Sequence, residues 1–141
     1  METEIELLKK IYTCTDTSSK TLNCILTKVT NPTLRKAIIT QINNYDKINS
    51  DAKSEISNLG HTAPKNVLPS LTAKLGAKIN SSVNKTDSGI AEIIIKESGS
   101  DIINITKAIN KNQTVAPACY NLGRKLIQNE EENIERIKGF L

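Results

Sequence analysis

The sequence is poor in aromatic residues and has a single histidine, His61. Tyr, Phe and Trp together make up 3% of its 141 residues, and Trp is absent. Sheet proteins usually depend on aromatic and β-branched side chains for packing, so this composition points away from a β fold. One histidine cannot form a histidine cluster for a metal and allows at most one histidine-based acid–base pair.

Motifs of phosphate binding and nucleophilic catalysis are also missing. The six glycines are scattered singly, and no G-x-S-x-G pattern occurs. The three cysteines, Cys14, Cys24 and Cys119, include no C-x-x-C pair. Cys14 and Cys24 fall on one predicted helix, about 15 Å apart along its axis, which is too far for a disulfide. We expect reduced, packed thiols, no catalytic residue and no cofactor, and we favour a protein that is not an enzyme.

Long apolar runs and a signal-peptide pattern are absent as well. The N-terminal segment carries Glu2, Glu4 and Glu6, where a signal peptide would carry basic residues followed by an apolar run. The 19 basic and 15 acidic residues leave a formal charge of +4. The arginines are few and form no basic stripe with aromatic residues, so a nucleic-acid partner is not indicated. We predict a cytoplasmic protein without a transmembrane segment.

Apolar residues at helical spacing are the main positive signal. They predict four helices, from about Glu4 to Val29, Pro32 to Leu59, Asp87 to Asn110 and Val115 to Leu141. Asn31-Pro32 separates the first two, because proline disfavours helical geometry in the residue before it. Gly60 is placed to end the second helix, and Asp87 or Ser88 to begin the third.

The lengths of the connections predict the topology. Two short connections join the first pair and the last pair of helices, so each pair is expected to be antiparallel. The stretch from Gly60 to Thr86 is long enough to cross the length of a bundle, and it contains a short amphipathic pattern after Pro69. We therefore predict one all-α domain over residues 1–141, a four-helix bundle with one long crossover that includes a short extra helix.

The crossover is the one distinctly basic part of the chain. Between Ile56 and Thr86 there is no Asp or Glu, and the basic residues are Lys65, Lys74, Lys78 and Lys85. A helix in this stretch either caps one end of the bundle with its apolar face inward or lies on an anionic surface. The second alternative makes the four lysines a candidate anionic-surface patch.

Polar residues interrupt the apolar stripes near the centre of each predicted helix. They are Thr15, Ser18, Gln41, Tyr45, Ser98 and Glu130. One interpretation is a hydrogen-bonded layer that sets the register of the helices, because buried polar groups need partners. The other is a small pocket for water, an ion or a small ligand. If Glu130 is buried without a cationic partner, its pKa should rise.

The chain resembles the ferritin-like superfamily, and more narrowly the small uncharacterised bacterial bundles with a ferritin-like fold. The resemblance is carried by the turn Asn31-Pro32-Thr33-Leu34-Arg35, by Ile90-Ala91-Glu92, and by the C-terminal stretch from Glu130 to Leu141. It covers nearly the whole chain and implies a bundle with a single crossover.

The metal-binding members of that superfamily use one Glu from each of two helices and a Glu-x-x-His pair from each of the other two. Here Asn58 stands three residues after Glu55, and Asn133 stands three residues after Glu130. We therefore predict no metal ligands, and the resemblance is to members that lack them.

Three functions follow for testing. We favour a non-enzymatic bundle that acts through self-association or a protein partner, because Ile90, Ile93 and Ile103 widen the apolar surface of the third helix. The first alternative is a carboxylate-bridged iron or manganese oxidase or storage protein with atypical ligands. The second is a peripheral binder of anionic surfaces that uses the lysine-rich crossover.

Overall fold

The computed structural model describes residues 2–65, 86–111 and 116–141. These residues form the helices α1 (Glu2–Leu26), α2 (Pro32–Asn58), α4 (Asp87–Lys111) and α5 (Pro117–Lys138), and they contain no strand. The prediction of an all-α four-helix bundle is confirmed. The short extra helix predicted after Pro69 lies outside the described residues.

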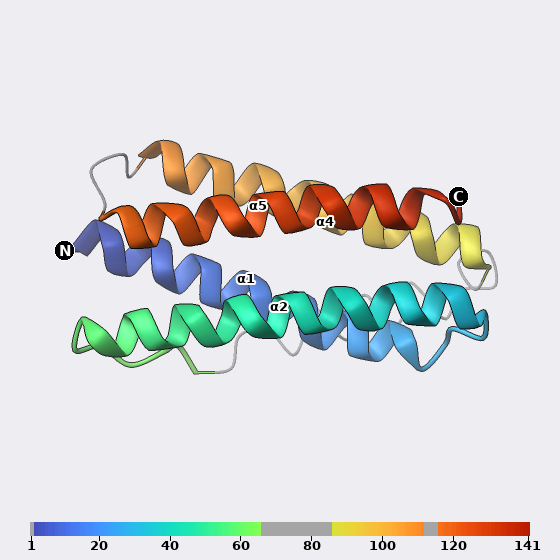
Figure 1. The fold of residues 1–141 in the computed structure, drawn as a ribbon, viewed down its shortest axis with the longest axis horizontal. Coiled ribbons are helices and arrows are strands. Elements are labelled where there is room, and N and C mark those ends of the chain that lie inside the picture. Colours follow the sequence, from blue (N-terminus) through green and yellow to red (C-terminus); the bar gives the residue numbers. More distant parts are fainter. Residues whose placement is uncertain (1, 66–85, 112–115) are drawn as a thin grey trace.

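The helices pack side by side along the long axis of the molecule (Figure 1). In this view α1 and α5 run from left to right, and α2 and α4 run from right to left. The two pairs that are adjacent in sequence, α1 with α2 and α4 with α5, are thus antiparallel. Since α2 and α4 point the same way, the end of α2 and the start of α4 lie at opposite ends of the bundle, as a single long crossover requires.

The boundaries of α2 are set by local side-chain chemistry. The Asn31 side chain accepts hydrogen bonds from the N–H groups of Thr33 and Leu34, at 2.9 and 3.2 Å, and Pro32 occupies the first turn. At the other end Gly60 has a φ of 78°, a left-handed conformation that favours glycine. The N–H of His61 donates to the carbonyl of Ile56, which completes a Schellman-type cap.

Other boundaries differ from the predicted ones. The N-cap of α4 is Thr86 and not Asp87 or Ser88, because the Thr86 hydroxyl accepts from the N–H of Gly89 at 3.0 Å. Helix α1 ends at Leu26, three residues before the predicted end at Val29. Arg35 explains how the chain leaves the helix there: its guanidinium donates to the carbonyls of Leu26 and Val29, at 2.8 and 3.0 Å. Helix α5 ends at Lys138, before Gly139.

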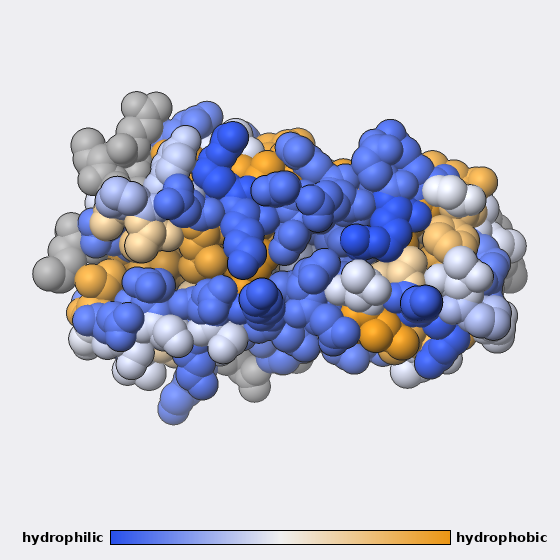
Figure 2. All heavy atoms as spheres, in the orientation of Figure 1, coloured by the Kyte–Doolittle hydropathy of each residue, from blue (hydrophilic) through white to orange (hydrophobic). Residues whose placement is uncertain are grey.

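The core runs the length of the bundle and consists almost entirely of aliphatic side chains. Its fully buried members include Leu8 and Ile11 of α1, Ile38 of α2, Ile94 of α4 and Leu126 of α5. Burial of apolar surface at about 25 cal/mol per Å² is the main source of stability for such a bundle. The face drawn in Figure 2 is largely hydrophilic, and hydrophobic residues reach its surface in small separate areas.

The apolar surface of α4 is mostly used within the chain itself. Ile90 and Ile93 are 1% and 6% exposed, because they pack into the core. Ile103 is 55% exposed. The prediction of self-association through this helix rests on these three isoleucines. Two of them, Ile90 and Ile93, are therefore core residues of the single chain.

Candidate functional site: a polar cavity at mid-bundle

Glu130 of α5 lies at the centre of a buried polar network. Its side chain is 0% exposed, although it is a carboxyl group among aliphatic residues. The Tyr45 hydroxyl, from α2, donates a hydrogen bond to Glu130 Oε1. The Asn133 amide donates to the same oxygen at 3.4 Å, and Arg136 in turn holds the Asn133 oxygen at 2.8 Å. Glu130 is thus anchored through one oxygen by two neutral donors.

The network continues from Tyr45 to α4 through Gln41. The Gln41 amide nitrogen donates to the Tyr45 hydroxyl at 3.1 Å and to the Ser98 hydroxyl at 3.4 Å. Both Gln41 and Ser98 are 1% exposed. The Gln41 Oε1 atom is buried and has no donor among the described residues. An unpaired buried carbonyl oxygen costs about 1–3 kcal/mol, so this atom marks a place where a donor from outside the chain would be favourable.

Asp101 of α4 brings a second carboxyl group to Glu130. The Ser18 hydroxyl, from α1, donates to Asp101 Oδ2 at 3.0 Å. Burial, followed by the nearby Asp101 carboxyl group, raises the pKa of Glu130 to about 10. Tyr45 and Asn133 act in the opposite direction, since they donate to the charged form. At neutral pH Glu130 is therefore protonated.

Cys14 of α1 faces this acid pair. Burial, followed by the charges of Asp101 and Glu130, raises the pKa of the Cys14 thiol far above its usual value. A thiol in this state is protonated and a poor nucleophile. Nucleophilic or redox catalysis by Cys14 is therefore disfavoured.

The Thr15 side chain bonds mainly to the backbone of its own helix, α1, and not to the site. Its hydroxyl donates to the carbonyls of Ile11 and Tyr12, at 2.9 and 3.1 Å, and accepts from Asn49 at 3.1 Å. Of the six mid-bundle residues named from the sequence, Gln41, Tyr45, Ser98 and Glu130 form one hydrogen-bonded chain. Ser18 joins the same region through Asp101, whereas Thr15 bonds to its own helix and to α2.

A cavity of about 750 Å³ opens between α1 and α4. Gln41 and Tyr45 of α2 form its floor, and its walls change in character along the helices. One end of the cavity is apolar and is lined by Leu22, Ile25 and Ile94. The middle is polar and is lined by Cys14, Ser18, Ser98 and Asp101. The other end is lined by Lys9, Lys10 and Lys107. The volume and the few convergent polar groups are those of a small-molecule site.

Comparison with known proteins identifies the fold and no more. No protein-family model and no curated protein sequence matches this chain. Its structure is similar to that of a DUF305 fragment from Deinococcus radiodurans, with a TM-score of 0.79 at 10% sequence identity, over 99% of this chain and 95% of the other. At this identity the similarity extends to the four-helix arrangement and gives no functional residue.

The comparison leaves the ferritin-like assignment as a prediction. A small helical bundle is what the similarity to the DUF305 fragment supports. In the described part of the chain, no helix has the length and apolar character needed to cross a bilayer.

The lysine patch is largely outside the described residues. Lys65 is exposed, and Lys74, Lys78 and Lys85 are not described. The binding of anionic surfaces by the crossover stays a prediction.

Two residues of the site were not found from the sequence. Cys14 was expected to be a reduced, packed thiol, and nothing in the helical pattern singled out Asp101. Cys14, Asp101 and Glu130 present ligand atoms that lie within 4.8 Å of one another. Spacing within one helix contains no signal for this group, because each member comes from a different helix.

Proposed function

We propose that this protein is a non-enzymatic binding protein, which holds a small amphiphilic molecule with a hydrogen-bond-donating head, an amine or a hydroxyl, in the cavity between α1 and α4. The observation that carries this proposal is the buried Gln41 Oε1, which has no donor among the described residues and belongs to a side chain that lines the cavity. A ligand hydroxyl or ammonium would satisfy it and recover the cost of leaving it unpaired.

The rest of the cavity supports the same ligand class. Asp101 in the polar middle adds a second acceptor and a negative charge, which favours a donor or a cation over a carboxylate. Leu22, Ile25 and Ile94 offer an apolar surface at one end for a hydrocarbon part. The lysines at the opposite end include the exposed Lys10 and Lys107, whose charges are screened by solvent.

A matched set of probes tests the proposal. Octylamine, octanol and octanoate share one chain and differ in the head group, and each is added to the full chain below its micellar concentration while thermal unfolding is followed. We expect the amine and the alcohol to raise Tm in a saturable manner, and octanoate to raise it less. Equal shifts for all three, or no shift for any, would overturn the proposal.

A variant that fills the cavity gives the control. Thr17 lines the cavity, and its hydroxyl has no hydrogen-bond partner among the described residues, so Thr17→Leu adds volume without removing a known bond. Thr3→Leu makes the same change at an exposed position of α1. We expect Thr17→Leu to abolish the octylamine shift and Thr3→Leu to leave it intact. Retained binding in Thr17→Leu would count against this cavity.

The finer predictions from the sequence stay beside this proposal. Membership of the ferritin-like superfamily is supported by the helix directions, and action through self-association or a protein partner by the exposed Ile103. A bacterial origin and a cytoplasmic location are likewise predictions.

A further inference from the structure

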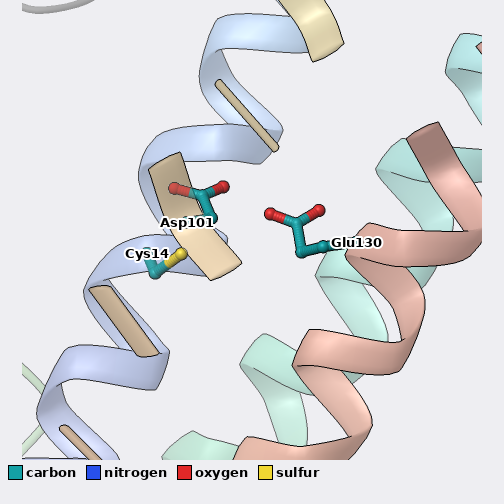
Figure 3. A group of neighbouring side chains, drawn as sticks. All are labelled: Cys14, Asp101 and Glu130. Atoms are coloured by element: carbon teal, nitrogen blue, oxygen red, sulfur yellow. The ribbon is translucent and has the colours of Figure 1, made fainter. Parts of the chain in front are cut away.

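Three metal-ligating side chains converge at the inner side of the cavity. Cys14 comes from α1, Asp101 from α4 and Glu130 from α5, and Figure 3 shows their side chains directed toward one another. A cysteine sulfur and one oxygen from each carboxyl group all lie within 4.8 Å of one another. The chain is folded back on itself to bring these residues together, since they are separated by tens of positions in the sequence.

Among the described residues, one oxygen of the Glu130 carboxyl group has no hydrogen-bond partner. Oε1 is held by Tyr45 and Asn133, whereas the buried Oε2 has no hydrogen-bond donor in the described part of the chain. The side chain is 0% exposed, so water from bulk solvent does not reach it directly. In Figure 3 the group is aimed at Asp101 and Cys14. A proton on Oε2 shared with Asp101, or a cation, would satisfy this atom.

The hydrogen bonds that hold Asp101 and Glu130 each use one carboxylate oxygen. Ser18 holds Asp101 through Oδ2 alone, at 3.0 Å, so that the second oxygen of this carboxyl group accepts nothing from Ser18. Glu130 is held in the same way through Oε1. Outer hydrogen bonds of this kind orient carboxylate ligands in metal sites. Glu130 therefore has one anchored oxygen and one that is available to an ion, and Asp101 is held by Ser18 through a single oxygen.

The donor set selects a class of metal. A thiolate with two carboxylates suits zinc or cobalt, while calcium and magnesium require oxygen ligands alone. Zinc bonds of about 2.0–2.3 Å place tetrahedral ligand atoms roughly 3.5 Å apart, so the group needs to contract by only about 1 Å. Cys14 and Glu130 release their protons when the ion binds, and the three anionic ligands then more than neutralise its charge. Cys14 and Asp101 also line the cavity, which provides the entry path.

We propose that Cys14, Asp101 and Glu130 form a mononuclear site for a divalent metal ion of the zinc class, whose fourth coordination position faces the cavity. The site contains a thiolate and no histidine, unlike the paired Glu-x-x-His pattern. It does not depend on the proposed binding of an amphiphile, which rests on Gln41 and the apolar end of the same cavity, although both proposals use Asp101.

Cobalt(II) serves as the spectroscopic probe. The full chain is purified with a chelator, freed of it and titrated with Co²⁺, while the near-ultraviolet band of thiolate-to-cobalt charge transfer and the visible bands of tetrahedral cobalt are recorded. We expect both to saturate at one ion per chain and to be removed by one equivalent of Zn²⁺. No saturable band at stoichiometric Co²⁺ would overturn the proposal.

Matched variants assign the ligands. Cys14→Ser should remove the charge-transfer band, and Cys24→Ser, which changes a half-buried thiol ten positions along the same helix, should leave it unchanged. Glu130→Gln keeps the shape of the side chain and removes a charged ligand, so cobalt affinity should fall at least about tenfold. A band that survives Cys14→Ser, or an affinity unchanged in Glu130→Gln, would overturn the site. The outcome with octylamine is measured separately, so either proposal can fail alone.

Discussion

Glu130 makes the stability of the bundle depend on pH. Its pKa is raised from an ordinary value of 4.5 to about 10, because the folded chain buries it beside Asp101. Below pH 4.5 the carboxyl group is protonated in both the folded and the unfolded chain, and its contribution to the free energy of unfolding is fully present. As pH rises toward 10 the unfolded chain releases the proton and the folded chain keeps it, so the free energy of unfolding falls.

The substitution Glu130→Gln tests this dependence. The amide can still accept from Tyr45 and can donate from nitrogen toward Asp101, without a proton that titrates. We expect the variant to be more stable than the native chain by about 4 kcal/mol at pH 8 and nearly equal to it at pH 4.5. Urea unfolding at the two pH values measures the difference. Glu131→Gln, at an exposed neighbouring position, should show no such change. The same difference in the free energy of unfolding at both pH values would show that Glu130 does not cause the pH dependence.

At the scale of helices, Gly123 sets how closely α5 approaches α4. It is buried, and a Cβ added there would lie 2.9 Å from Ile109 Cδ1 and 3.7 Å from Ile11 Cδ1. The first distance is below ordinary van der Waals contact, so Ile109 would have to move. Gly99, in the middle of α4, has nothing within 4 Å of an added Cβ. The two glycines therefore have different roles in otherwise similar helices.

The pair Gly123→Ala and Gly99→Ala separates packing from helix propensity. Alanine is favoured over glycine in a helix by about 0.5–1 kcal/mol, so Gly99→Ala should stabilise by that amount. Gly123→Ala should destabilise by about 1 kcal/mol, because overpacking costs more than the propensity gain. Chemical unfolding measures both.

Ile109→Val removes the crowded Cδ1 atom and completes a double-mutant cycle. In the Ile109→Val background we expect Gly123→Ala to lower the free energy of unfolding much less than in the native chain. The coupling energy between the two substitutions should be at least about 0.5 kcal/mol. Additive effects of the two substitutions would show that the close approach of α4 and α5 does not depend on Gly123.

At the scale of the whole molecule, the exposed apolar residues are dispersed. Ile39, Ile103, Tyr120 and Leu141 are the large apolar side chains more than a third exposed in the described residues, and they belong to different parts of the bundle. Stable protein interfaces bury about 800 Å² on each partner. On α4 the described residues include one such exposed apolar side chain, Ile103.

We therefore expect a monomer at micromolar concentration in sedimentation velocity. Association through α4 would appear only at higher concentration, and Ile103→Lys would remove it, while Ile39→Lys on α2 would not. A dimer that persists at micromolar concentration in the native chain and in Ile103→Lys would contradict this expectation.

The four helices and their limits could be predicted from the sequence to within a few residues. The Asn31-Pro32 start of α2 and the Gly60 cap are encoded by neighbours in the chain, so local reading located them. The N-cap of α4 was placed one or two residues late, because Thr86, Asp87 and Ser88 can all cap a helix. Only the hydrogen bond from the Gly89 N–H distinguishes Thr86.

The site was predicted in part. The polar interruptions at Gln41, Tyr45, Ser98 and Glu130 break the helical period, which a single helix reveals. The position of Asp101 opposite Glu130 depends on how α4 rotates about its axis against α5, and the place of Cys14 depends on α1 in the same way. A rotation of one residue, about 100°, would move either side chain away.

Periodicity and capping are local properties of the chain, and for this protein they suffice for an all-helical bundle with polar residues at mid-height. The association of Cys14, Asp101 and Glu130, the burial of Glu130 and the cavity between α1 and α4 arise from contacts between helices distant in sequence. They were decided by the packing of aliphatic side chains, because that packing fixes the rotation and spacing of each helix against its neighbours.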